Sequence, residues 1–301
     1  AYNWRERYYI QAALAMEASS RFGADTKAGL KLCGVPWALL PSVAASWVAT
    51  NEDWFPTTTG LNYMRLNIGF DVSGNDNVPN NASRTYFQAT KLLGTIGGTV
   101  LGGVGNTDLR WETTRRLTYG IDLKLLNDRL AVSANFFHSR TTNLLSLQSL
   151  AYVTGMAQNW GNGGELANRG FDINATARLL NRKDWKWEMG ASLGHYNNKV
   201  KKLPEGNFIT DLYGGSVITQ VGSPVGLFYG YKTEGVFSTT AEAQAANLCV
   251  EDEAGRRTQF QAGDLHFVDF NGDGVINESD RTVIGNPNPD IFGNIFTSLT
   301  W

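Results

Sequence analysis

The sequence predicts an all-β fold, an antiparallel transmembrane β-barrel, from three features. Apolar and polar side chains alternate with period 2 over segments of about nine residues, close to the length that a tilted membrane-spanning strand needs. Tight turns alternate with long polar loops. Glycine (33 residues) and aromatic side chains (12%) are abundant, which is typical of a strand-rich chain with many turns.

The alternation is clearest in residues 117–125, where leucine, tyrosine and isoleucine occupy the odd positions and polar residues or glycine the even ones. In a barrel strand, alternate side chains point to lipid and to the lumen, so a mean hydropathy of −0.25 does not exclude a membrane protein. A soluble β-sandwich also alternates, and strand length favours the barrel. The alternating segments are 8–16, 64–70, 117–125, 130–136, 171–179 and 185–193.

The connections between these segments fall into two classes. Asn127 and Asp128 form a tight turn between two long strands, and residues 181–184 form another. Outer-membrane barrels have short periplasmic turns and long extracellular loops, so this asymmetry favours a barrel over a sandwich. The predicted long loops are Asp71–Arg84, Arg140–Gly164 and Thr239–Gly263.

Two shorter segments interrupt the strand pattern. Residues Thr239–Leu248 predict a short helix with Thr240 as its N-cap, because alanine and glutamine favour helix. The glycine-rich segment Gly94–Gly105 resembles a phosphate-binding loop only in composition. It has neither the strand–loop–helix order nor the following lysine, so we expect a flexible loop.

Aromatic residues near the predicted strand ends suggest membrane-interface girdles, where an apolar ring and a polar tip are both satisfied. The alternative is that these residues form the core of a soluble protein. The residues are Trp111, Phe136, Phe137, Trp185 and Trp187.

Charge and cysteine content exclude several classes of function. A net charge of −2 gives no basic field for nucleic acid. Cys33 and Cys249 are far apart in the sequence and form no metal or redox motif, which leaves either a disulfide or two unrelated thiols.

No catalytic motif is convincing, so we expect no enzyme. His138, His195 and His266 are isolated in the sequence. Gly190–Gly194 matches the G-x-S-x-G pattern of serine hydrolases, but it lies in the middle of a predicted strand instead of at a strand-to-helix elbow.

One loop has the spacing of a calcium site. Residues 269–280 place oxygen-bearing side chains at loop positions 1, 3, 5, 9 and 12, with glycine at position 6 for the sharp turn. Position 12 is aspartate instead of the longer glutamate, and the alternative is a metal-free turn held by Asx hydrogen bonds. The predicted calcium ligands are Asp269, Asn271, Asp273, Val275 and Asp280.

Four segments resemble, in order, the SusC/RagA family of TonB-dependent outer-membrane transporters. Residues 263–290 resemble a signature near the family's C-terminal end. Asn106–Thr114 resembles its N-x-x-L-x-W-E run, and Val221–Phe237 its G-x-P-x-x-x-F-Y-G-Y segment. Residues 19–52, with Ser-Ser-Arg-Phe-Gly at their start, match near the beginning.

The resemblance implies that residues 1–301 are one segment of a 22-stranded barrel in the bacterial outer membrane. It also implies uptake of oligosaccharides or peptides with a SusD-like surface lipoprotein, driven by TonB–ExbB–ExbD through a plug outside these residues. Loops 71–84 and 140–164 would face the lipoprotein or the substrate, and calcium would brace the 269–280 loop. The alternative is a soluble secreted calcium-dependent carbohydrate-binding or adhesion domain.

Overall fold

The computed structural model describes all residues except 27–28, 33–34, 57–59, 93, 95 and 252–254. Residues 1–301, predicted to form one barrel segment, divide into two compact units. Unit 1 comprises Ala1–Gly206 and Pro289–Trp301, and unit 2 comprises Asn207–Asn288. Within the described residues, no helix is long and apolar enough to cross a membrane.

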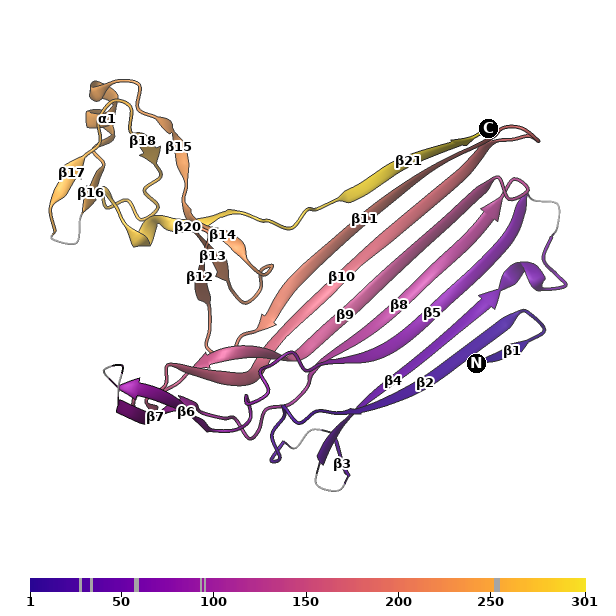
Figure 1. Ribbon diagram of the computed structural model, residues 1–301. Helices are drawn as coiled ribbons and strands as arrows, with labels where there is room; N and C mark the ends of the chain where they lie inside the picture. The colour runs from indigo at the N-terminus through magenta and orange to yellow at the C-terminus, as the bar shows by residue number, and fades with distance from the viewer. Residues whose placement is uncertain (27–28, 33–34, 57–59, 93, 95, 252–254) are drawn as a thin grey trace. The chain divides into compact units, whose positions relative to one another are not determined.

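Unit 1 is built on a 10-stranded antiparallel sheet, with its long strands side by side in Figure 1. The strand order is β1-β2-β4-β5-β8-β9-β10-β11-β21, and β3 pairs with β4. Chain order and spatial order therefore nearly coincide, as in an up-and-down barrel wall. The strands are β1 (Tyr2–Trp4), β2 (Tyr8–Ala18), β3 (Leu30–Leu32), β4 (Val35–Val48), β5 (Leu61–Asn75), β8 (Glu112–Leu125), β9 (Leu130–Ser149), β10 (Gln158–Asn181), β11 (Lys186–Lys202) and β21 (Phe292–Thr300).

The register gives the sheet two chemically different faces. Ile68, Tyr119, Phe136 and Phe171 are successive cross-strand partners, and every strand contributes to such rows. We call the side that bears them the apolar face. Many of its large side chains are between 38% and 75% exposed: Ile10, Leu14, Val43, Ile68, Leu117, Tyr119, Phe136, Leu193 and Ile295.

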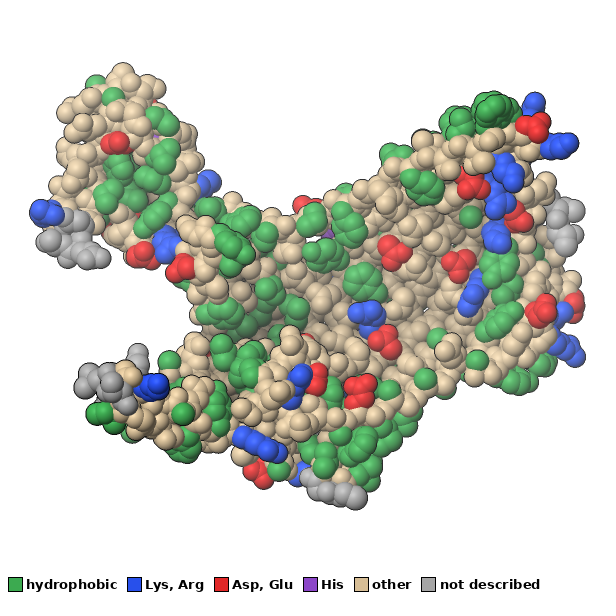
Figure 2. All heavy atoms as spheres, viewed as in Figure 1, with side chains coloured by type: hydrophobic (Ala, Val, Ile, Leu, Met, Phe, Trp, Pro, Cys, Tyr) green, Lys and Arg blue, Asp and Glu red, His purple; other side chains and the backbone are tan. Residues whose placement is uncertain are grey.

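The opposite side, here called the polar face, carries the alternate positions of the same strands. Asp122, for example, lies directly opposite Arg65 on one side and Ser133 on the other. Figure 2 shows acidic and basic side chains spread among polar atoms on the side of the sheet turned to the viewer. The predicted all-β fold and the alternation behind it are confirmed.

The connections differ in length at the two ends of the strands, as predicted. The β8–β9 turn spans only Leu126–Arg129, and positive φ angles of 55°, 56° and 64° at residues 126–128 reverse the chain. The predicted loop Arg140–Gly164 is wrong, because β9 and β10 continue as paired strands far into it. Its irregular part is Leu150–Ala157, with the 3-10 turn η2 (Tyr152–Thr154). A second 3-10 turn, η1 (Ala49–Asn51), follows β4.

The glycine-rich segment predicted as a flexible loop instead forms half of a hairpin, β6 (Tyr86–Leu92) with β7 (Ile96–Gly103). Glycine is needed where the Tyr86 ring lies against β7. A Cβ added at Gly102 or Gly103 would come within 2.6 or 2.7 Å of that ring.

Unit 2 contains small sheets and one helix (Figure 1). A four-stranded sheet has the order β12-β13-β14-β20, β15 pairs with β18, and β16 lies between β17 and β19. The elements are β12 (Phe208–Leu212), β13 (Gly215–Thr219), β14 (Leu227–Tyr231), β15 (Thr233–Val236), α1 (Thr240–Ala246), β16 (Cys249–Glu251), β17 (Arg257–Gln259), β18 (Leu265–Phe267), β19 (Val275–Ile276), the 3-10 turn η3 (Glu278–Asp280) and β20 (Arg281–Gly285).

The predicted helix is present, but its cap is one residue earlier than predicted. The Thr239 hydroxyl accepts a hydrogen bond from the Glu242 amide at 3.2 Å, so Thr239 and not Thr240 is the N-cap. Cys249 is a free thiol, while Cys33 lies outside the described residues.

Among the described residues, each unit has one cluster of buried apolar side chains. Phe22, Val78, Ala82 and Leu109 form it in the loops of unit 1. In unit 2 the cluster is Phe237, Ala243, Leu248, Phe260 and Ile276. The long sheet strands supply no fully buried member of either cluster, although Leu145 of β9 and Trp160 of β10 pack against the first one.

Candidate functional site

The polar face carries a ladder of amide–carboxylate hydrogen bonds across neighbouring strands. Asn67 donates to the Asp122 carboxylate at 2.7 Å, and Asn135 donates to the Asp172 carboxylate at 2.9 Å. Each amide uses its Nδ2 group on its neighbour, and both carboxylates keep further acceptor capacity. A wall of this kind presents acceptors and donors to a polar solute.

Arg65 adds a positive charge to the polar face. Its guanidinium donates to the Ser46 hydroxyl at 2.8 Å and lies 5.7 Å from the Tyr9 ring centroid. The Arg65 Nε atom and the Asn67 Oδ1 atom are buried and have no hydrogen-bond partner among the described residues. Neither Arg65 nor the Asn–Asp ladder was predicted as a site, although these residues lie at the polar positions of the alternating segments.

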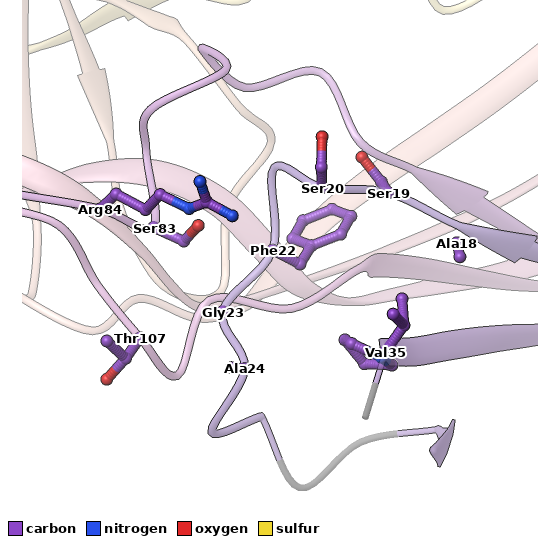
Figure 3. A pocket seen from close by; sticks show the side chains of 11 residues that line it. Ala18, Ser19, Ser20, Phe22, Gly23, Ala24, Val35, Ser83, Arg84 and Thr107 are labelled. Carbon is purple, nitrogen blue, oxygen red and sulfur yellow. The ribbon is translucent and has the colours of Figure 1, made fainter. Parts of the chain in front are cut away.

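A cavity of about 380 Å³ lies among the loops of unit 1. Figure 3 shows Ser83 and Arg84 on one side of the Phe22 ring and Ser19 and Ser20 on the other. Hydroxyl groups, a guanidinium and an aromatic ring are the groups that bind polar organic solutes such as sugars and peptides.

The loop that holds Phe22 packs against the segment before β8. The Phe22 and Trp111 ring centroids are 4.8 Å apart, and the Gly23 amide donates to the Leu109 carbonyl at 3.0 Å. A Cβ at Gly23 would lie 1.7 Å from the Thr107 carbonyl oxygen, so only glycine permits this approach. The girdle prediction for Trp111 is wrong, because its ring packs in this loop cluster.

At the short-turn end, Glu52 gathers donors from three residues. The Tyr8 hydroxyl donates at 2.6 Å, the Trp47 indole at 3.0 Å and the Arg7 guanidinium at 3.2 Å. The Tyr8 hydroxyl first, then the indole, hold the pKa of Glu52 below its ordinary value. Tyrosine and tryptophan at the end of an apolar face are typical of a membrane interface.

The predicted calcium loop lies in unit 2. Asp269 accepts backbone N–H bonds from Gly272 and Gly274, both at 2.7 Å. These bonds, Gly274 first, hold the pKa of Asp269 below its ordinary value. Gly274 has a φ of 78°, as the sharp turn at this position requires.

The remaining predicted ligands surround the same turn. Asn271 accepts from the Asp273 amide at 3.0 Å, and Asp273 accepts from the Val275 amide at 2.7 Å. Asp280 is fully buried and accepts from the Phe270 and Asn277 amides at 3.0 and 2.9 Å. The loop is thus closed by backbone donors on three carboxylates.

The 269–280 loop offers oxygen atoms of several side chains around one turn. Among the described residues, no group of three or more histidine, cysteine, aspartate or glutamate side chains is arranged to hold a metal ion. The oxygens of Asp269, Asn271 and Asp273 remain available as hard ligands because each retains a free lone pair. Calcium binding stays a prediction.

The three histidines and Ser192 take part in strand pairing and side-chain packing. His138 and His195 lie on the apolar face, opposite Leu117 and Phe171. His266 stacks on Phe237 with ring centroids 4.4 Å apart. The Ser192 hydroxyl donates to the Asn294 side chain at 2.8 Å within paired strands, so no nucleophile elbow forms.

The fold is a two-faced antiparallel sheet with long loops at one end. A match to a family model shows which protein family the chain belongs to. The model described as TonB dependent receptor-like, beta-barrel matches residues 1–275. The chain belongs to the TonB-dependent receptor β-barrel family. This family consists of receptors and transporters.

Curated relatives of this TonB-dependent receptor barrel carry the same family name. TonB-dependent receptor P3 of Formosa agariphila is 27% identical over 96% of this chain, which spans 28% of that protein. TonB-dependent receptor SusC of Bacteroides thetaiotaomicron is 23% identical over 100% of this chain, which spans 29% of it. The chain thus spans less than a third of these relatives.

Solved structures show the same fold. The RagAB peptide importer in its open-open state matches 99% of this chain with a TM-score of 0.76 at 20% identity. The chain covers 30% of the matched RagAB chain. The sheet of unit 1 is therefore a segment of a TonB-dependent receptor barrel, as the sequence predicts.

Proposed function

We propose that the polypeptide containing this chain is a TonB-dependent importer in the bacterial outer membrane, and that unit 1 is part of its barrel wall. The observation that carries the proposal is the two-faced sheet. An apolar face this large and exposed fits contact with lipid, because soluble proteins rarely expose so large an apolar patch. The hydrogen-bonded polar face fits an aqueous lumen.

We further propose that the cargo is an oligosaccharide or a peptide. Such cargo is rich in hydroxyl and amide groups, which suit the Asn–Asp ladder of the polar face and the loop cavity around Phe22. By analogy with SusC and RagAB, a SusD-like surface lipoprotein would deliver the cargo, and TonB–ExbB–ExbD would act on the importer outside residues 1–301. Nucleic acid is not an expected partner, since the net charge is −2.

Fractionation and the intact mass of the native polypeptide test this proposal. We expect a protein roughly three times the 33.0 kDa of this chain, since the chain spans 28–30% of its relatives. It should be found in the outer membrane and co-purify with a lipoprotein. A soluble product of 33 kDa without a partner would overturn the proposal and favour the secreted carbohydrate-binding alternative.

Calcium at the 269–280 loop is a separate proposal, supported by the hard oxygens of Asp269, Asn271 and Asp273 around one turn. We expect added calcium to slow amide hydrogen exchange of residues 269–280 in the full-length protein. Asp273→Asn should abolish this effect while keeping the turn, because an asparagine oxygen can still accept from the Val275 amide. If calcium did not change the amide hydrogen exchange of residues 269–280 in the unsubstituted protein, the proposal would be contradicted.

A further inference from the structure

The apolar face changes character toward the end of the strands that bears the long loops. Tyr119, Phe136, Phe171 and His195 form one row across β8, β9, β10 and β11. Successive ring centroids are 5.5, 6.1 and 5.7 Å apart. A continuous row of rings on a membrane-facing sheet marks the level of the lipid headgroups.

Basic side chains occupy the next two rows beyond these rings. Arg169 lies opposite His138 in the first row, and Arg115 lies directly opposite Arg140 in the second. Lys199 continues the second row on β11. Arg115, Arg140, Arg169 and Lys199 are all exposed, and together we call them the basic cluster.

In the part of the chain that the structure describes, one member of the basic cluster has an acidic partner. Arg140 forms an ion pair with Glu165 at 2.6 Å. Among the described residues, no ion pair joins Arg115, Arg169 or Lys199 to a carboxylate. Like charges directly opposite each other on neighbouring strands are destabilising, so the Arg115–Arg140 pair costs stability that an external anion would offset.

The position of the basic cluster indicates which anion would bind it. Each row lies roughly 6–7 Å beyond the previous one along the strands, so the guanidinium groups reach just past the aromatic row. In the outer-membrane location proposed above, this level on the long-loop side is the headgroup region of the outer leaflet. The anions there are the phosphate groups of lipids.

We propose that the basic cluster binds the phosphate groups of a phosphorylated glycolipid of the outer leaflet, with the acyl chains lying along the apolar face below. Arginine suits this task because its planar guanidinium donates two parallel hydrogen bonds to a phosphate. The aromatic row lies between the phosphates and the acyl chains, against the sugar part of the headgroup. The inference rests on the proposed outer-membrane location.

The test uses the full-length protein, purified in detergent and freed of co-purified lipid. Binding of phosphorylated lipid A is compared with binding of dephosphorylated lipid A and of inorganic phosphate by native mass spectrometry. We expect Arg115→Gln combined with Arg169→Gln to weaken binding of phosphorylated lipid A at least about tenfold, because two charge-assisted contacts are lost. Arg115→Lys should lose less, since it keeps the charge.

The matched control is Arg116→Gln combined with Arg129→Gln. It removes the same charge from the polar face of the same strand and from the β8–β9 turn, and it should leave lipid binding unchanged. Heat-modifiable migration in gels verifies that each variant is folded. Equal affinity in the Arg115/Arg169 variant and the unsubstituted protein, or an equal loss in the control, would overturn the proposal.

Three further outcomes would also overturn it. Dephosphorylated lipid A binding as tightly as the phosphorylated form would show that phosphate is not recognised. Inorganic phosphate competing equally well would show that the ligand is a free anion. If the unsubstituted protein co-purified with an acidic protein and the Arg115/Arg169 variant did not, while both bound lipid equally, the basic cluster would be a protein interface. The lipid-binding assay needs neither cargo nor TonB. Its result can therefore be told apart from a failure of the import proposal.

Discussion

Asp280 is the residue on which the 269–280 loop most depends. Its side chain is fully buried, and it accepts two backbone hydrogen bonds from opposite sides of the loop. We expect Asp280→Ala to lower the free energy of local opening by about 2–5 kcal/mol, because two backbone amides lose a buried acceptor. Hydrogen exchange of residues 270–280 in the full-length protein measures this free energy.

Glu278→Ala is the control for this substitution. Glu278 is 80% exposed and forms a surface ion pair with Arg281, and such pairs contribute about 0–1 kcal/mol. Similar effects of the two substitutions would contradict the role assigned to Asp280.

The protonation of Asp269 should link the loop to pH. Its pKa is lowered in the folded protein by the Gly274 and Gly272 amides, so the unfolded loop binds its proton more tightly. The resulting stabilisation is complete above the unfolded pKa of about 3.9 and is lost as the pH falls through the lower folded value. We expect protection of the Gly272 and Gly274 amides to be constant from neutral pH to about pH 5 and to fall below about pH 4.

Hydrogen exchange corrected for the intrinsic rate at each pH tests this expectation. In Asp269→Asn the protection should be lower at neutral pH and independent of pH in this window. A loop that retains full protection below the folded pKa would contradict the assignment.

At the level of single strands, the side chains of β8 point alternately to the apolar face and to the polar face. Ile121 lies on the apolar face between Leu66 and Ala134. We expect Ile121→Lys to destabilise the barrel by about 2–4 kcal/mol, because a charge on the lipid-facing side must leave water. Denaturant unfolding of the full-length protein in lipid vesicles measures the change.

Ser133→Lys on the neighbouring strand is the matched control. Ser133 lies on the polar face directly opposite Asp122, so the new ammonium group would remain in water beside a carboxylate. We expect a change within about 0.5 kcal/mol. If the two lysines had equal effects, the assignment of the faces would be wrong.

At the scale of the whole molecule, the sheet of unit 1 ends on β1 and β21 without closing on itself. Unpaired strand edges and an exposed apolar face are both unfavourable, in water and in lipid. We therefore expect residues 1–301 expressed alone to aggregate in buffer without detergent. The full-length protein in detergent should be monodisperse, and size-exclusion chromatography compares the two. A monodisperse monomer of residues 1–301 in plain buffer would contradict the lipid-facing assignment.

Sequence patterns predicted the elements better than their ends. The strand over 117–125 and the turn at Asn127–Asp128 are confirmed, because alternation and turn residues are local signals. The loop predicted over 140–164 is wrong because backbone pairing between β9 and β10 continues through most of it, and such pairing does not require apolar side chains. Likewise, the stacking of Tyr86 on Gly102 and Gly103 in the β6–β7 hairpin left no periodic signal.

The candidate site was predictable only in part. The oxygen spacing of residues 269–280 located one turn, since all the calcium ligands predicted there lie in a single segment. The Asn67–Asp122 and Asn135–Asp172 contacts join strands distant in the chain. They depend on the hydrogen-bond register, which no single segment encodes.

By itself, the sequence determined the all-β class, the two faces of each strand and the asymmetry of the connections, because side-chain direction in a strand follows from parity alone. Tertiary structure decided which residues share a row and that Asn207–Asn288 forms a separate unit. Arg115, Arg140 and Arg169 come from three strands and are neighbours only because the register aligns them. Register arises from backbone pairing between strands, so it exists only in the assembled sheet.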